Sequence, residues 1–156
     1  MKPFLGFWGQ LKKPIFVLAP LANVTDAVFR AHIVKHSKPA RNASDASSRN
    51  DAGGPAVFWT EFVAADGLCH PKGRQALLRD LQYSEAERPI VAQLFTAYPD
   101  KMREAAKIVT ELGFDGIDIN MGCPDKNVMK QGAGAACMKD PELAQALIVA
   151  AREGSI

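Results

Sequence analysis

The sequence predicts an α/β protein with a parallel sheet, and two observations lead to this prediction. Short apolar runs typical of buried strands alternate with segments in which apolar side chains recur at helical spacing. The links between these segments are short, which favours right-handed βαβ units. A full (β/α)8 barrel takes about 250 residues, so this chain holds roughly half of the units of such a barrel.

Four strands are expected, at residues 15–19, 56–61, 90–94 and 115–120. The run from Pro14 to Ala19 is almost continuously apolar, as expected of a strand buried on both faces. In the fourth strand Ile117 and Ile119 alternate with polar side chains, which indicates one apolar and one polar face. Residues 74–79 fit either a strand or a helical turn.

Three longer helices are predicted, over residues 25–35, over residues 100–112 and from residue 140 onward, and a short helix and loop are expected after residue 61, through Pro71. Thr25 and Asp26 are capping residues for the first helix, in which Val28 is one of the apolar residues at helical spacing. Gly113 stands where the second helix needs a C-terminal cap. Asp140 caps the third helix, with a proline at its first position.

Composition excludes several kinds of protein. The net charge of +2 is too small to require or exclude an anionic partner. Cys69, Cys123 and Cys137 form no CxxC pair, which favours a reduced, intracellular and cytoplasmic protein without a zinc site or disulfides. No stretch reaches the roughly 20 apolar residues of a membrane span. Residues 37–54 contain no large apolar side chain and are expected to form a mobile, disordered surface insertion.

Polar side chains gather where the predicted strands end. If the strands are parallel, Pro20, Glu61, Gln93 and Asn120 share one edge of the sheet, where ligands of α/β proteins bind. Cys123 follows on a Gly-Cys-Pro turn, which presents a thiol on a rigid backbone. Taken alone, this cysteine also fits a small filler in a turn, and the two amides also fit side chains that cap strand ends.

The sequence resembles the tRNA-dihydrouridine synthases, which are flavin-dependent reductases of uridine in tRNA. The matching motifs lie, in the order and spacing of the family, at residues 19–26 with 29–30, 60–61, 93–95, 118–124, and 130–135 with 138–141. The Asn-Met-Gly-Cys-Pro and Gly-Ala-Gly-Ala elements are the most specific of these. Leu21 and Asn23 stand where the family has Met and Gly; Leu21 keeps an apolar wall, and Asn23 tolerates a left-handed backbone.

The resemblance implies the N-terminal half of a TIM (β/α)8 barrel, truncated, with residues 1–156 forming part of an FMN-binding domain. It implies hydride transfer from the N5 atom of reduced FMN to C6 of a flipped-out uridine, with NADPH as reductant and tRNA as partner. Cys123 would protonate C5, a role that suits a thiol whose usual pKa is about 8.5. By motif position the flavin contacts are Pro20, Leu21, Gln93, Asn120 and Lys139.

Two alternatives stay open at this point. Another FMN barrel oxidoreductase, of the dihydroorotate dehydrogenase type, also carries Asn and Cys-Pro after a central strand. The chain could also be a truncated, non-catalytic product. Even if the chain is a dihydrouridine synthase sequence, the 156-residue fragment is expected to be inactive alone, because half of a barrel leaves two strand edges unpaired.

Overall fold

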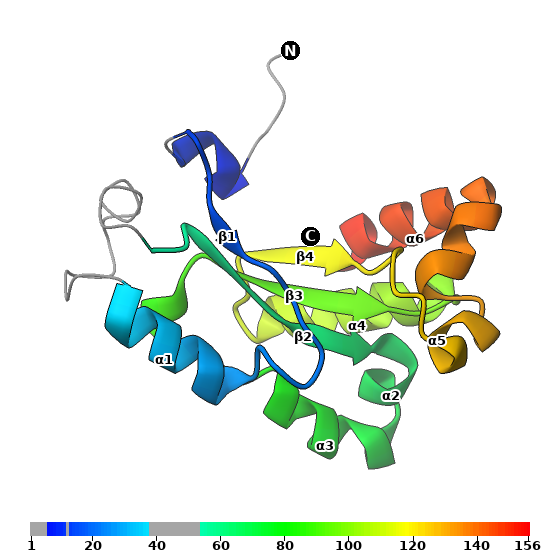
Figure 1. The fold of residues 1–156 in the computed structure, drawn as a ribbon. Helices are drawn as coiled ribbons and strands as arrows, with labels where there is room; N and C mark the ends of the chain where they lie inside the picture. The colour runs from blue at the N-terminus through cyan, green and yellow to red at the C-terminus, as the bar shows by residue number, and fades with distance from the viewer. Residues whose placement is uncertain (1–5, 12, 38–53) are drawn as a thin grey trace.

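A four-stranded parallel sheet forms the centre of the protein (Figure 1), in the order β1-β2-β3-β4. A computed structural model describes residues 6–11, 13–37 and 54–156, so most of the predicted insertion, residues 38–53, lies outside the described residues. The strands are β1 (Val17–Leu18), β2 (Val57–Ala64), β3 (Ile90–Phe95) and β4 (Gly116–Ile119). Parallel strands flanked by helices confirm the predicted α/β class, as part of a TIM barrel.

Helices connect the strands and flank the sheet. They are α1 (Ala27–Ser37), α2 (Ala65–Cys69), α3 (Pro71–Asp80), α4 (Pro99–Glu111), α5 (Lys126–Lys130) and α6 (Pro141–Gly154), with 3₁₀ helices η1 (Gly6–Gln10), η3 (Glu85–Glu87) and η4 (Gly134–Lys139). The segment that sequence left ambiguous is thus helical and belongs to α3. Across the described ranges, no helix combines the length and apolar character needed to cross a membrane.

Capping contacts confirm Asp26 and Asp140 as helix caps, whereas Thr25, the other predicted cap of α1, bonds with the Leu21 backbone instead. Asp26 Oδ1 accepts a hydrogen bond from the Phe29 amide at 2.7 Å, and Asp140 Oδ1 accepts one from the Leu143 amide at 3.0 Å. Gly113 has a φ of +84° directly after α4, a conformation that glycine adopts without a steric penalty. Local sequence therefore determines where α1, α4 and α6 begin or end.

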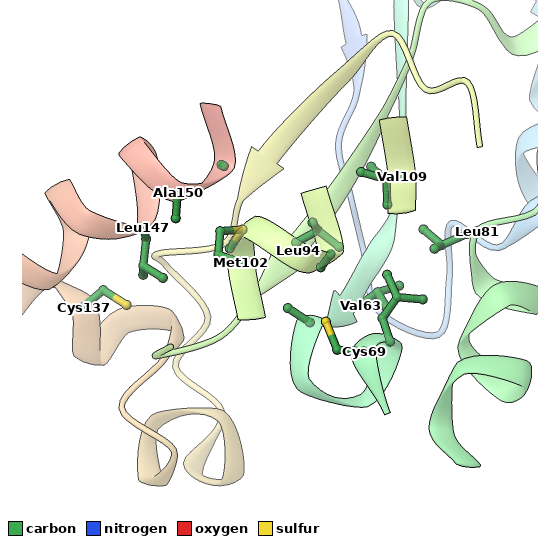
Figure 2. Close-up of a cluster of buried hydrophobic side chains, with 14 residues drawn as sticks. Val63, Cys69, Leu81, Leu94, Met102, Val109, Cys137, Leu147 and Ala150 are labelled. Carbon is green, nitrogen blue, oxygen red and sulfur yellow. The ribbon is translucent and has the colours of Figure 1, made fainter. Parts of the chain in front are cut away.

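The main hydrophobic core lies between the sheet and helices α2, α4 and α6, and Figure 2 shows its side chains. Leu94 of β3, Met102 of α4 and Leu147 of α6 belong to this core, and all three are fully buried. Ile117 and Ile119 of β4 pack against the same core. The polar residues that alternate with them therefore face the opposite side of the sheet, as the period-two pattern predicted.

Two strand predictions need correction. The expected strand at 15–19 is only Val17–Leu18, and it is not buried on both faces, since Phe16 is 68% exposed. It is an edge strand that pairs only with β2 within the described residues, so its outer side faces solvent. The strand expected to end at Glu61 continues to Ala64 through an irregularity between Trp59 and Phe62, because the apolar run continues beyond the acid.

Helix α1 does not bury the apolar face that its sequence predicted. Val28 is 77% exposed, and the buried residue of this helix is Arg30, which has no exposed surface. Its Nε donates to Glu87 Oε2 at 2.6 Å, and its Nη1 donates to the Thr25 carbonyl at 2.7 Å. A buried ion pair, in place of apolar packing, thus attaches α1 to the segment before β3.

Candidate active site

The centre of the candidate site is Gln93, near the carboxyl end of β3. It stands beside Asp118 in the parallel register of β3 and β4, and both residues lie on the sheet face opposite the main core. Gln93 is 8% exposed, and its Nε2 donates to Asp118 Oδ2 at 2.5 Å. An acid on the neighbouring strand therefore determines which way the amide of Gln93 points.

Asn120 connects this pair to the cysteine turn. Its Nδ2 donates to Gln93 Oε1 at 3.2 Å. Its Oδ1 accepts from the backbone amide of Cys123 at 2.9 Å and from that of Gly122 at 3.2 Å. One hydrogen-bonded series thus runs from Asp118 through Gln93 and Asn120 to Cys123, across the carboxyl ends of adjacent parallel strands.

The Cys123 thiol is half-buried against a small apolar cluster at the same end of the sheet. This cluster contains Phe95, Val128 and Ala133. Phe95 lies two residues after Gln93 on β3, so both side chains point to the same face. In Figure 1 the strands β2, β3 and β4 point toward the end of the molecule where α5 follows the cysteine turn. Cys123 therefore lies on the same rim as Gln93 and Asn120.

The loop between β1 and α1 carries two predicted cofactor residues, Pro20 and Leu21. Leu21 is 53% exposed, and its amide donates to Thr25 Oγ1 at 3.0 Å. Asn23 has a φ of +59°, which confirms the expected left-handed backbone, and its amide donates to the Glu61 carboxylate. Glu61 therefore acts here as a structural acceptor that attaches this loop to β2.

The structure joins only part of the predicted site. Gln93, Asn120 and Cys123 are connected by hydrogen bonds, whereas no described contact joins Pro20 or Leu21 to them. Lys139 is exposed at the end of η4, and its side chain makes no hydrogen bond or ion pair with another residue of the described ranges.

Gln93 and Asn120 still have free donors and acceptors after the hydrogen bonds described above are counted. Gln93 keeps one N–H and one lone pair on Oε1, and Asn120 keeps one N–H. These groups can pair with a planar heterocycle that presents both donors and acceptors along one edge. The isoalloxazine ring of FMN has such an edge, so the chemistry of these residues fits a flavin.

The other two cysteines differ from Cys123 in their surroundings. Burial, followed by the nearby Glu104 carboxylate, raises the pKa of Cys69 from 9.0 to about 12. Burial also raises the pKa of Cys137. Both thiols therefore stay protonated and unreactive at neutral pH, as expected of structural cysteines.

Sequence reasoning missed two parts of this site. Asp118 was recognised as a residue on the polar face of β4 but was not assigned to the site. The signal that could have found it is its position two residues before Asn120 on the same face. The second is the backbone of Gly134 and Ala135, where the Ala135 amide donates to the Cys123 carbonyl at 2.9 Å. No local pattern predicts a contact of this kind.

Parallel strands with helices on one face and an acid, two amides and a thiol at their carboxyl ends define an α/β domain of the barrel type, with a ligand site on its C-terminal rim. Comparison with known families makes the assignment specific. The model of the family described as "Dihydrouridine synthase (Dus)" matches residues 17–154, and the chain belongs to this family.

Curated proteins with similar sequences are named as probable tRNA-dihydrouridine synthases. The chain is 41% identical over 151 residues to "Probable tRNA-dihydrouridine synthase 2" of Bacillus subtilis, a match that covers 97% of this chain and 42% of the relative. It is 38% identical to "Probable tRNA-dihydrouridine synthase" of Staphylococcus aureus strain COL, over 97% of this chain and 41% of the relative. The chain thus spans about two fifths of the length of these relatives.

Proposed function

We propose that residues 1–156 form part of the FMN-binding barrel domain of a flavin-dependent tRNA-dihydrouridine synthase, which reduces uridine in tRNA with NADPH as the source of electrons. The observation that carries this proposal is the hydrogen-bonded series from Gln93 through Asn120 to Cys123 at the carboxyl ends of adjacent strands. Family membership supports the same reading.

Each candidate residue has a stated role in this proposal. Gln93 and Asn120 bind the polar edge of FMN through their remaining N–H groups and lone pair. Pro20 and Leu21 form an apolar wall beside the ring. Lys139 supplies positive charge near the N1 and C2–O atoms of the flavin.

Cys123 is proposed to donate a proton to C5 of the uracil ring. FMN that has been reduced by NADPH would, when bound, supply the hydride for C6, so the C5–C6 double bond would gain one hydride and one proton. The thiol becomes a thiolate and then takes a proton from solvent. Its half-buried position gives the thiol access to a substrate from the open side of the rim.

We propose an intracellular, cytoplasmic location for this activity, where tRNA is the partner. Cys69, Cys123 and Cys137 are all free thiols, and persistent free thiols are typical of a reducing compartment.

A chimera tests the proposed function. Residues 1–156 replace the aligned 151-residue stretch of the Bacillus subtilis relative, so that this chain supplies the reactive cysteine. Unmodified tRNA, FMN and NADPH are added, and dihydrouridine is measured by mass spectrometry. We expect dihydrouridine to form, and Cys123→Ala to reduce the initial rate by about 100-fold or more, in line with the loss of a general acid.

The same assay separates the alternatives. Dihydroorotate is offered to the chimera in place of tRNA, and turnover of dihydroorotate alone would support the dihydroorotate dehydrogenase type. Equal rates of dihydrouridine formation by the chimera and its Cys123→Ala variant would contradict the proposed role of the thiol as proton donor. A Cys69→Ala variant serves as the control, since Cys69 lies in the main core, on the face of the sheet opposite Gln93.

A further inference from the structure

Two backbone hydrogen bonds hold Cys123 from different parts of the chain. Its amide donates to Asn120 Oδ1 at 2.9 Å, and its carbonyl accepts from the Ala135 amide at 2.9 Å. The first bond attaches the cysteine to the end of β4. The second attaches it to η4, which follows α5. The position of Cys123 therefore depends on η4 as well as on the strand that precedes the cysteine turn.

Gly134 is the residue that allows the second bond to form. Its φ is +60°, and a Cβ at this position would lie 2.7 Å from the Cys123 carbonyl oxygen and 2.8 Å from Val128 Cγ1. Real Cβ atoms essentially never come within 3.0 Å of an atom of a residue that is not adjacent in the chain, and a backbone carbonyl cannot move aside as a flexible side chain can. Any side chain at residue 134 would push η4 away from the cysteine turn.

We infer that Gly134 and the Ala135 amide are positioning groups for Cys123: the glycine permits the close approach of η4, and the amide fixes the cysteine carbonyl. The importance of this arrangement for catalysis rests on the proposed role of Cys123 as proton donor. The arrangement itself can be tested without flavin, tRNA or turnover.

The chain offers two matched controls. Gly132 lies in the same loop and has a φ of +78°, but a Cβ there would meet only Ala97 Cβ, at 3.3 Å. Gly132→Ala therefore introduces the same kind of backbone strain without the collision with Cys123. Gly122 adjoins the cysteine, and a Cβ there would have nothing within 4 Å. Gly122→Ala therefore tests the effect of an added methyl group in the cysteine turn when there is no collision.

The experiment measures how fast iodoacetamide modifies Cys123 in the 156-residue chain, with each thiol followed by peptide mass spectrometry. Gly134→Ala should raise the rate at Cys123 by about fivefold or more, because release of η4 opens the apolar cluster that half-buries the thiol. Gly132→Ala and Gly122→Ala should stay within about twofold of the unmodified chain. Cys69, which lies in the main core and outside η4, should remain slow in all of them.

Two results would overturn the inference. One is a Gly134→Ala rate within about twofold of the unmodified chain, and the other is an equal increase in Gly132→Ala, which would indicate general loosening of the loop. If Gly134→Ala unfolds the chain, rapid modification of Cys69 by iodoacetamide will reveal it. In that case amide hydrogen exchange in the chain without substitutions tests the inference. Protection of the Ala135 amide is then expected, and exchange at the rate of a free amide contradicts the inference. Neither outcome depends on whether the chimera makes dihydrouridine.

Discussion

The side chain of Asn120 donates a hydrogen bond to Gln93 at 3.2 Å, although 27 residues separate them in the sequence. The same side chain accepts hydrogen bonds from the backbone amides of Gly122 and Cys123. Asn120 therefore has two functions at once, since it orients the amide on β3 and determines the shape of the turn that carries the thiol.

Substitutions of Asn120 should separate these two functions. Asn120→Ala removes the acceptor of both backbone amides and should lower the free energy of unfolding by about 1–3 kcal/mol. Asn120→Asp keeps the acceptor but loses the donor to Gln93, so it should retain the turn. Urea denaturation and amide exchange at Cys123 measure the difference. Equal exchange rates at Cys123 in the two variants would contradict this assignment.

Asp118 should be required for the orientation of Gln93. In the chimera, Asp118→Ala removes the charged acceptor of Gln93 Nε2 and should reduce dihydrouridine formation by about tenfold, the equivalent of one charge-assisted hydrogen bond. Asp118→Asn should restore part of the activity, because its Oδ1 can still accept from Gln93. Glu153→Ala is the control, since this exposed acid of α6 pairs with Arg103 of α4 and with no residue of the candidate site.

Removal of both partners of the buried ion pair should cost less stability than the sum of the two single removals. Glu87→Met leaves Arg30 charged and without its carboxylate, and should lower the free energy of unfolding by about 3–5 kcal/mol. The Arg30→Met/Glu87→Met double variant should lose less than the sum of the two single variants. Urea denaturation of all four proteins gives the coupling energy, and strict additivity would show that the pair does not act as a unit.

Reactivity of the three thiols should follow their burial. At pH 8.5 we expect iodoacetamide to modify Cys123 first, because burial raises the pKa of Cys69 to about 12 and raises that of Cys137. A raised pKa in the folded state also means that the unfolded chain releases this proton first. The contribution of Cys69 to stability is therefore complete below pH 9 and falls as pH rises toward 12. Comparing Cys69→Ala with the unmodified chain across this range isolates the effect.

The 156-residue chain by itself should bind FMN at least about 100-fold more weakly than the chimera does. Four strands leave the ring-binding face open, and Leu21 is 53% exposed in the β1–α1 loop. Isothermal titration of both proteins with FMN measures the two dissociation constants. Stoichiometric yellow flavin on a monomer of the 156-residue chain would refute this prediction.

Local sequence patterns were sufficient for much of the fold. Period-two alternation at Ile117 and Ile119 assigned the faces of β4 correctly, because strand geometry alone requires it. Caps such as Asp26 and Asp140 placed helix ends, because their hydrogen bonds reach only three residues along the chain. The Gly-Cys-Pro turn and the Asn120 amide were likewise visible as a candidate site.

Contacts between distant segments were not visible in this way. The pairing of Gln93 with Asp118 depends on the register of β3 against β4, and the Arg30–Glu87 pair joins residues 57 positions apart. Val28 was expected inside and is exposed, because the segment beside α1 supplies a carboxylate where an apolar surface was assumed.

The sequence by itself determined the α/β class, the helix caps and the polar face that carries the amides, since each depends on interactions within a few residues. Only the tertiary structure decided that Asp118 orients Gln93 and that Gly134 admits the Ala135 amide to Cys123. These contacts arise from strand register and close backbone approach, which are set by the packing of the whole domain.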